Sequence, residues 1–170
     1  MTPKRMMLAF MALGVLLPLA ACGTAESTSS GFRKNYVVAR SALEGGEYGQ
    51  ANRQYAQLMS SAGPFLPRIQ LEYAHSLLRA GNYAQAAQMA EAMSMASDGA
   101  ASAAALSVAA TARHELGLEA LAEGKTQAGK MHLEHAQASM SQVLSTHPEL
   151  DPLGSLAGRQ ASIAVRLKAL

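Results

Sequence analysis

Apolar side chains recur at every third or fourth position through most of the chain, a spacing that is typical of amphipathic helices. In one stretch, Ala51, Tyr55 and Leu58 fall on a single helical face, and Gly63-Pro64 ends the pattern soon afterwards. Runs of β-branched residues, which favour strands, are few. The sequence therefore predicts an all-α fold. The expected helices cover residues 32–45, 48–61, 69–80 and 83–95, a long helix that starts near 98 and ends before 124, then 126–145, and a last helix within 154–170.

A short glycine-tyrosine-alanine motif occurs twice, 35 residues apart. Residues 46–51 read GEYGQA and residues 81–86 read GNYAQA. Glycine ends one helix because it adopts the left-handed conformation at little cost. The tyrosine then starts the next helix by packing back on the first, and the alanine lets the two helices approach closely. The motif therefore predicts helical hairpins that repeat along the chain.

This repeat resembles the tetratricopeptide repeat (TPR), a helical hairpin of similar length. Beyond the turn, Ala74 falls at the family's small-residue position, and Leu116-Gly117 matches its Leu-Gly pair in a third unit. The third unit departs from the pattern, since its turn glycine, Gly124, follows the previous one by 43 residues and Thr126 replaces the tyrosine. The resemblance implies a short TPR-like solenoid of two to three repeats with a C-terminal capping helix. A plain helical bundle in which the turns recur by chance is the alternative.

The first residues have the pattern of an export signal. Lys4 and Arg5 precede an apolar run over residues 6–17, which is too short to span a bilayer. The closing motif, Leu-Ala-Ala-Cys at residues 19–22, contains the single cysteine of the chain and resembles a bacterial lipobox. That resemblance implies that a signal peptide over residues 1–21 is removed. A plain signal peptide with an unrelated cysteine nearby is the alternative.

The lipobox resemblance also implies a membrane anchor. Cys22 would be lipidated on sulfur and acylated on its new amino group, and two chains suffice for stable anchoring. In the sorting of such lipoproteins, an aspartate after the cysteine accompanies retention in the inner membrane. Gly23 stands there instead, which implies the periplasmic face of the outer membrane.

Residues 22–31, rich in glycine, serine and threonine, predict a flexible tether between the lipid and one helical domain over residues 32–170. Removing Lys4 and Arg5 with the leader takes Lys plus Arg from 14 to 12, equal to the 12 Asp plus Glu. A neutral mature chain excludes nucleic-acid binding on electrostatic grounds, because such binding depends on clustered basic residues. With its single thiol lipidated, the mature chain would form no disulfide, so that packing alone would stabilise it.

His132 and His135 are the candidates for metal chemistry, because a spacing of three places two imidazoles on neighbouring turns of one helical face. The sequence offers no third ligand beside them, so solvated surface histidines are expected and no metal. A periplasmic metal-binding protein or metal-dependent hydrolase that uses this pair is the alternative function. No Ser-His-Asp set, nucleophilic cysteine or phosphate-binding loop is visible in the sequence, and neither catalysis nor a cofactor is expected.

The TPR resemblance further implies a concave groove, lined by the first helix of each hairpin, in which a peptide or helix of another protein binds. Transferring the family's groove positions gives a stripe with four arginines, two histidines and one glutamate, which favours an acidic or carboxylate-bearing peptide. The groove residues expected from this resemblance are Arg33, Tyr36, Arg40, Glu44, Arg68, Leu71, His75, Leu78, Arg79, His114 and Leu118.

Together, the two resemblances imply an outer-membrane-anchored periplasmic adaptor that mediates protein–protein interaction and is not an enzyme. Small lipoproteins of this type resemble assembly factors of envelope machines, notably the tight-adherence pilus assembly lipoprotein and the type IV pilus pilotins. Lipoproteins that assemble outer-membrane β-barrels are a second candidate class. The expected partner is an envelope protein, such as a secretin or a pilus component.

Overall fold

The computed structural model describes residues 23–170, with side chains from residue 30 onward. Seven α-helices and two short 3-10 helices follow one another, and this part of the chain contains no strand. The all-α prediction is therefore confirmed. The elements are α1 (Gly23–Glu44), α2 (Tyr48–Met59), η1 (Gly63–Phe65), α3 (Leu66–Arg79), α4 (Tyr83–Met95), α5 (Gly99–Ala122), α6 (Thr126–Thr146), η2 (Pro148–Leu150) and α7 (Ser155–Lys168).

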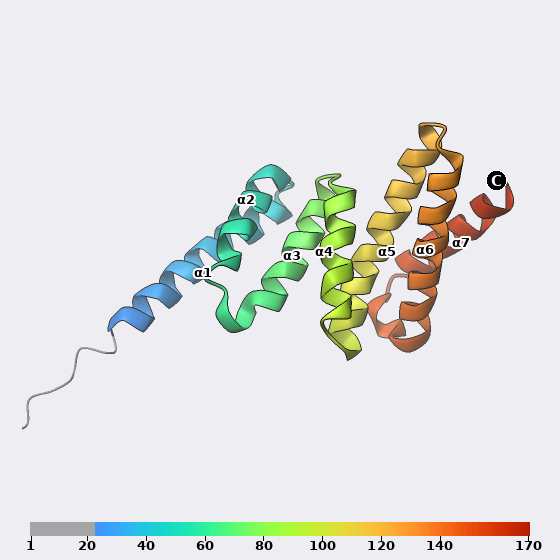
Figure 1. The fold of residues 1–170 in the computed structure, drawn as a ribbon. Helices are drawn as coiled ribbons and strands as arrows, with labels where there is room; N and C mark the ends of the chain where they lie inside the picture. Colours follow the sequence, from blue (N-terminus) through green and yellow to red (C-terminus); the bar gives the residue numbers. More distant parts are fainter. Residues whose placement is uncertain (1–22) are drawn as a thin grey trace, which may run out of the picture.

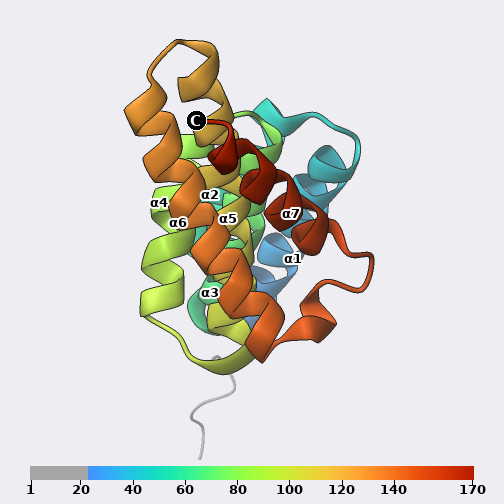
Figure 2. The same cartoon turned by 90° about the vertical axis from the view of Figure 1, so that its right-hand side faces the viewer.

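The helices pair in chain order into three hairpins, α1 with α2, α3 with α4 and α5 with α6, and each hairpin packs against the next. Figure 1 shows the hairpins side by side in a row, with the start of α1 at one end and α7 at the other. Figure 2 looks along this row from the α7 end. Because α7 packs on α6 and α5, it covers the last hairpin.

The core consists of several interfaces along the row instead of one central cluster. Tyr55 and Ile69 are buried where α1, α2 and α3 meet. Leu77 is buried among α3, α4 and α5, and Leu133 and Ile163 are buried among α5, α6 and α7. Each cluster draws on three successive helices, so that neighbouring hairpins stabilise one another.

The turns within the three hairpins have the same geometry. Gly46, Gly81 and Gly124 adopt positive φ angles of 79°, 79° and 74°, a conformation that glycine reaches at little steric cost. In each turn, the amide after the glycine donates a hydrogen bond to the carbonyl five residues earlier, at 2.8, 2.9 and 2.8 Å. The predicted turn therefore recurs a third time before α6, although Thr126 replaces the tyrosine there.

Most helix boundaries agree with those predicted from the sequence. Ala51, Tyr55 and Leu58 form the buried face of α2. Pro67 lies in the first turn of α3, where a proline without an amide hydrogen fits best. Asp98 precedes α5, whose length of 24 residues takes in the extra alanine-rich segment of the third hairpin. The last helix, α7, lies within the range expected for a capping helix.

The start of α1 differs from the expectation. Its backbone is helical from Gly23 onward, whereas the sequence predicted a flexible tether over residues 22–31. The packed part of α1 provides the nucleus, and extending an existing helix is much less costly than starting one. The predicted signal peptide over residues 1–21 and the predicted lipidation site Cys22 lie outside the described residues. None of the helices in the described part combines the length and the apolar character needed to cross a membrane.

Candidate functional site

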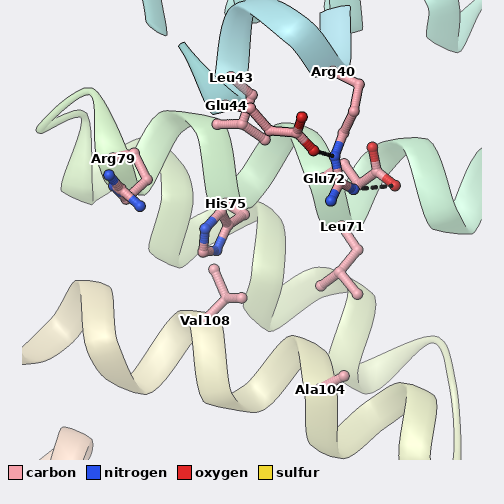
Figure 3. Close-up of a pocket in the computed structure, with 9 residues that line it drawn as sticks. All are labelled: Arg40, Leu43, Glu44, Leu71, Glu72, His75, Arg79, Ala104 and Val108. Carbon is pink, nitrogen blue, oxygen red and sulfur yellow. Dashed lines mark hydrogen bonds and ion pairs between the residues drawn. The ribbon is translucent and has the colours of Figure 1, made fainter. Parts of the chain in front are cut away.

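A hollow of about 390 Å³ opens between α1, α3 and α5, the first helices of the three hairpins. We call it the groove. Figure 3 shows apolar side chains at its base and charged side chains around them, with α1 on one side and α5 on the other. The lining residues are Arg40, Leu43 and Glu44 from α1, Leu71, Glu72, His75 and Arg79 from α3, and Ala104 and Val108 from α5.

Five of the eleven predicted groove residues line this hollow: Arg40, Glu44, Leu71, His75 and Arg79. The spacing of four residues between Arg40 and Glu44, and again between Leu71 and His75, places each pair on one helical face. The packing of α1 beside α3 then brings the two faces together. From α5, the resemblance selected His114 and Leu118, whereas Ala104 and Val108, also four residues apart, line the groove.

Five other predicted residues lie outside the groove. Arg33, Tyr36 and Arg68 line a separate hollow beside the middle of α1. Leu78 is partly buried and packs against the core cluster shared by α3, α4 and α5. Leu118 is half-buried on α5. The predicted stripe is therefore divided between the groove, a second hollow and the helix interfaces.

The structure corrects the assignment of His114 to the groove, because α7 covers this residue. Its exposed fraction is 7%, and its Nδ1 lies 2.8 Å from a guanidinium nitrogen of Arg159 on α7. Arginine can only donate, so Nδ1 accepts this hydrogen bond. Burial is the main cause that lowers the pKa of His114; Glu115 opposes the shift, and Arg159 and Arg166 add to it. The sequence predicted a capping helix but did not indicate which face of α5 it would cover.

Glu72 occupies the middle of the charged network beside the groove, although the sequence analysis did not single it out. One carboxylate oxygen accepts hydrogen bonds from the Tyr36 hydroxyl at 2.8 Å and from Arg68 Nε at 3.1 Å. The other oxygen accepts from the buried Tyr55 hydroxyl at 2.9 Å, and Arg40 Nη1 lies 3.5 Å from the carboxylate. The spacing of four residues from Arg68 was the available signal. The contacts with α1 and α2 form only when the helices pack together, so no pattern in the sequence near Glu72 indicates them.

The groove is nearly neutral, which corrects the expectation of a basic stripe. Two arginines, Arg40 and Arg79, line it together with two carboxylates, Glu44 and Glu72. Arg40 Nε donates to Glu44 at 2.6 Å. Arg79 donates to the Tyr48 hydroxyl at 2.7 Å, and its guanidinium lies 5.3 Å from the centre of that ring. A partner therefore meets charges of both signs instead of a continuous positive surface.

His75 lies between Leu71 and Arg79 at the centre of the groove, as Figure 3 shows. The ring keeps an open side toward solvent, but the walls of the groove remove part of its hydration. This desolvation is the main cause that lowers the pKa of His75, and the positive charges of Arg79 and Arg40 lower it further, while Glu72 opposes them. The imidazole is therefore neutral at pH 7 and offers one donor and one acceptor to a ligand.

No family model, curated protein or solved structure matches this chain. The side chains that line the groove are therefore what indicates the kind of molecule it can bind. An apolar base, charges of both signs and a neutral imidazole suit a peptide or helix that buries apolar side chains and forms a few hydrogen bonds at the rim.

The histidine pair of α6 belongs to a charged cluster that α6 shares with α4 and α5. His132 Nδ1 accepts a hydrogen bond from Arg113 at 3.2 Å, and Arg113 holds Glu91 through two bonds of 2.6 and 2.7 Å. Burial and the positive charge of Arg113 lower the pKa of His132, while His135 is exposed. An arginine beside His132 disfavours a second cation there. In the described part of the chain, no three His, Cys, Asp or Glu side chains gather closely enough to hold a metal ion.

Proposed function

We propose that this protein is a lipid-anchored adaptor of the cell envelope, whose TPR-like solenoid of two to three repeats holds a segment of another envelope protein in the groove. The observation that carries the proposal is the shared groove of α1, α3 and α5. Residues chosen for their repeat positions, among them Leu71 and His75, lie in this one hollow. A surface built from equivalent helices of successive hairpins is the kind of surface on which such solenoids bind their partners.

Three features of the described residues support the TPR-like part of the proposal. The same glycine turn joins the two helices of all three hairpins. The motif alanines, Ala51 and Ala86, and the small-residue position Ala74 are all fully buried, as expected where helices approach closely. Contacts between helices mostly join neighbours in the chain, which is typical of a repeat array.

The lining of the groove indicates what kind of segment it binds. Leu71 and Val108 offer apolar surface to one or two aliphatic or aromatic side chains. Arg79 has five N–H donors, and Tyr48 engages one of its nitrogens, which leaves donors for a carboxylate or a backbone carbonyl. Because Glu72 and Glu44 oppose the arginines, we expect a mixed apolar and polar segment instead of a run of acidic residues.

The N-terminal sequence supports the location. The resemblance of residues 19–22 to a lipobox implies acylation of Cys22, and Gly23 in the next position implies the outer membrane. An adaptor held there on the periplasmic side would meet the components of envelope machines, such as a pilus or a secretion system. A secretin or a pilus component is the partner that this resemblance implies.

The proposal is tested by a crosslinking pull-down of the full-length protein from its own envelope, with partners identified by mass spectrometry. We expect an envelope protein in the eluate, and an about tenfold or greater loss of it when His75 and Arg79 are both replaced by alanine, since central interface residues often contribute more than 1 kcal/mol each. The matched control replaces an exposed histidine and an exposed arginine outside the groove, His135→Ala with Arg53→Ala, and should keep the partner.

Two results would each contradict one part of the proposal, and a third would contradict the whole of it. Equal capture of the partner by the groove variant and by its control would contradict the proposal that the partner binds in the groove. Capture of the same partner by a Cys22→Ala protein that is no longer in the membrane fraction would show that anchoring is not needed. Absence of any protein partner in all samples would contradict the adaptor itself.

A further inference from the structure

A second hollow, of about 560 Å³, lies between the middle of α1 and the segment over residues 61–69, and is separate from the groove. Phe32 of α1 and Phe65 of η1 stack there with ring centroids 5.9 Å apart, and Phe32 also stacks with Tyr36 at 6.5 Å. Phe65 is 57% exposed, and Pro64 beside it is exposed as well. These four residues form a continuous apolar surface, which we call the aromatic end. Apolar surfaces of this kind mark contacts with another molecule or with a membrane.

Two arginines flank the aromatic end. Arg33 lies on α1 and Arg68 lies on α3; both line this hollow and are exposed. The guanidinium of Arg68 lies 5.6 Å from the centre of the Tyr36 ring and donates to its hydroxyl at 3.0 Å. The residues that line this hollow include these two arginines and no carboxylate. Glu72 pairs with Arg68, so that Arg33 supplies the excess positive charge.

We propose that the aromatic end docks on an anionic phospholipid surface, with Phe32 and Phe65 among the headgroups and Arg33 and Arg68 beside the phosphates. This proposal rests on the membrane anchoring proposed above. Aromatic rings flanked by basic side chains suit the membrane interface, because the rings gain an apolar environment while the cations remain near anionic headgroups.

The position of the aromatic end in the chain supports a lipid occupant. Cys22 precedes Phe32 by ten residues, which is about 15 Å along a helix. An upright α1 would lift Phe32 above the headgroup layer of one leaflet, which is roughly 5–8 Å thick. Docking therefore requires α1 to lean toward the membrane plane. The anchor keeps the surface within reach at all times, so that even a weak contact is populated.

A single tryptophan can report the contact, since the chain contains none. The full-length Phe65→Trp protein, purified from membranes, is reconstituted into vesicles of phosphatidylethanolamine and phosphatidylglycerol. We expect its emission to shift to shorter wavelength and to be quenched when brominated phospholipids replace ordinary ones. The matched control is Met131→Trp on α6, where the native side chain is 59% exposed. Its emission should stay at the wavelength of a solvated tryptophan and resist quenching.

Charge removal tests the electrostatic part. Adding Arg33→Gln to the Phe65→Trp protein should lower the ratio of docked to undocked protein about fivefold. Vesicles of phosphatidylcholine alone should give a similar loss without any substitution. The equivalent change at the exposed Arg53, which is outside the hollow, should leave quenching unchanged.

The outcomes separate this proposal from the anchoring on which it depends. Phe65→Trp protein that floats with the vesicles while its emission stays unquenched would overturn docking and leave anchoring intact. Protein that does not float at all would overturn both. A shift of the Phe65→Trp emission to shorter wavelength only after an envelope protein is added would also overturn lipid docking, and would assign the aromatic end to a protein partner.

Discussion

Glu72 determines how much positive charge the groove presents, and it also holds three helices together. Its carboxylate binds hydroxyls from α1 and α2 and lies against Arg40 and Arg68. The Tyr55 side chain is fully buried, and a buried hydroxyl without a partner would cost about 1–3 kcal/mol. Burial, with the adjacent Glu72 carboxylate as a second cause, raises the pKa of Tyr55 well above its usual value, so Tyr55 remains a donor. The same residue thus stabilises the fold and limits the charge available to a partner.

The lowered pKa values of three histidines predict that the protein loses stability in mild acid. Burial is the main cause that lowers the pKa values of His75, His114 and His132, and nearby arginines lower them further. In the unfolded chain their pKa returns to 6.5, so unfolding takes up protons once the pH drops below that value. The free energy of unfolding should therefore be highest above pH 6.5 and should decline toward about pH 5, by at most about 1.4 kcal/mol per pH unit for each histidine.

Denaturant titrations at several pH values measure this decline. In a His114→Gln protein, glutamine can accept the hydrogen bond from Arg159 but cannot take up a proton, so the decline should be shallower. His135→Gln, at an exposed position, controls for the loss of an imidazole. Glu91 and Asp151 have lowered pKa values, and they lose their contribution at lower pH, below the histidine window. A His114→Gln profile parallel to that of the original protein would contradict the account.

At the scale of single residues, the sequence could predict which side chains share one face of a helix, but not which side chains meet between different helices. Arg40 with Glu44, and Leu71 with His75, were selected through the TPR resemblance, and their spacing of four residues places each pair on one helical face. Glu72 was missed because its strongest contacts come from α1 and α2. His114 was misplaced because its burial depends on how α7 folds back over α5.

Helices α5 and α6 approach each other closely at two glycines, Gly117 and Gly129. A Cβ atom added at Gly117 would lie 2.7 Å from Leu133 Cδ2 and 3.2 Å from the Gly129 carbonyl oxygen. A Cβ added at Gly129 would lie 2.6 Å from Leu121 Cδ2 and 3.1 Å from the Gly117 carbonyl oxygen. The two glycines therefore face each other and leave room for the leucine side chains, which explains a glycine inside each helix despite its low helix propensity.

Alanine substitutions at two helical glycines should have opposite effects. Gly129→Ala should lower the free energy of unfolding by about 1–3 kcal/mol, because the added methyl group overpacks the contact between α5 and α6. Gly158→Ala in α7, where no atom lies within 4 Å of the added Cβ, should raise it by about 0.5–1 kcal/mol through better helix propensity. Thermal and denaturant unfolding of the two variants measure the difference. Stabilisation by Gly129→Ala would show that the two helices are not in close contact there.

The existence and boundaries of most elements could be predicted because local signals mark them. Turn glycines mark the ends of α1, α3 and α5, and prolines mark the start of α3 and the end of α6. The early start of α1 could not be predicted, since residues 23–31 favour a flexible segment by composition. A helix that is already held by packing extends cooperatively into neighbouring residues, and this effect cannot be predicted from the composition of those residues.

At the scale of the whole molecule, the row of hairpins places two surfaces in different positions. The groove lies between the first helices of the three hairpins, whereas the aromatic end lies between the middle of α1 and the segment over residues 61–69; Figure 1 shows these helices along the row. An anchored protein that docks through the aromatic end would keep the groove available to a partner. The sequence could indicate the repeated hairpins, and the anchor stays a prediction from the sequence, but only the packing of three helices defines the groove.

The most direct test of the adaptor account is site-specific photocrosslinking in the native envelope. A photoreactive phenylalanine analogue replaces Leu71 in the groove, and the same analogue replaces the exposed Met131 on α6 as the control. The account predicts a crosslink from position 71 to one envelope protein, absent from position 131 and lost when Cys22 is replaced by alanine. No adduct from position 71, or the same adducts from both positions, would contradict the claim that the groove holds a partner.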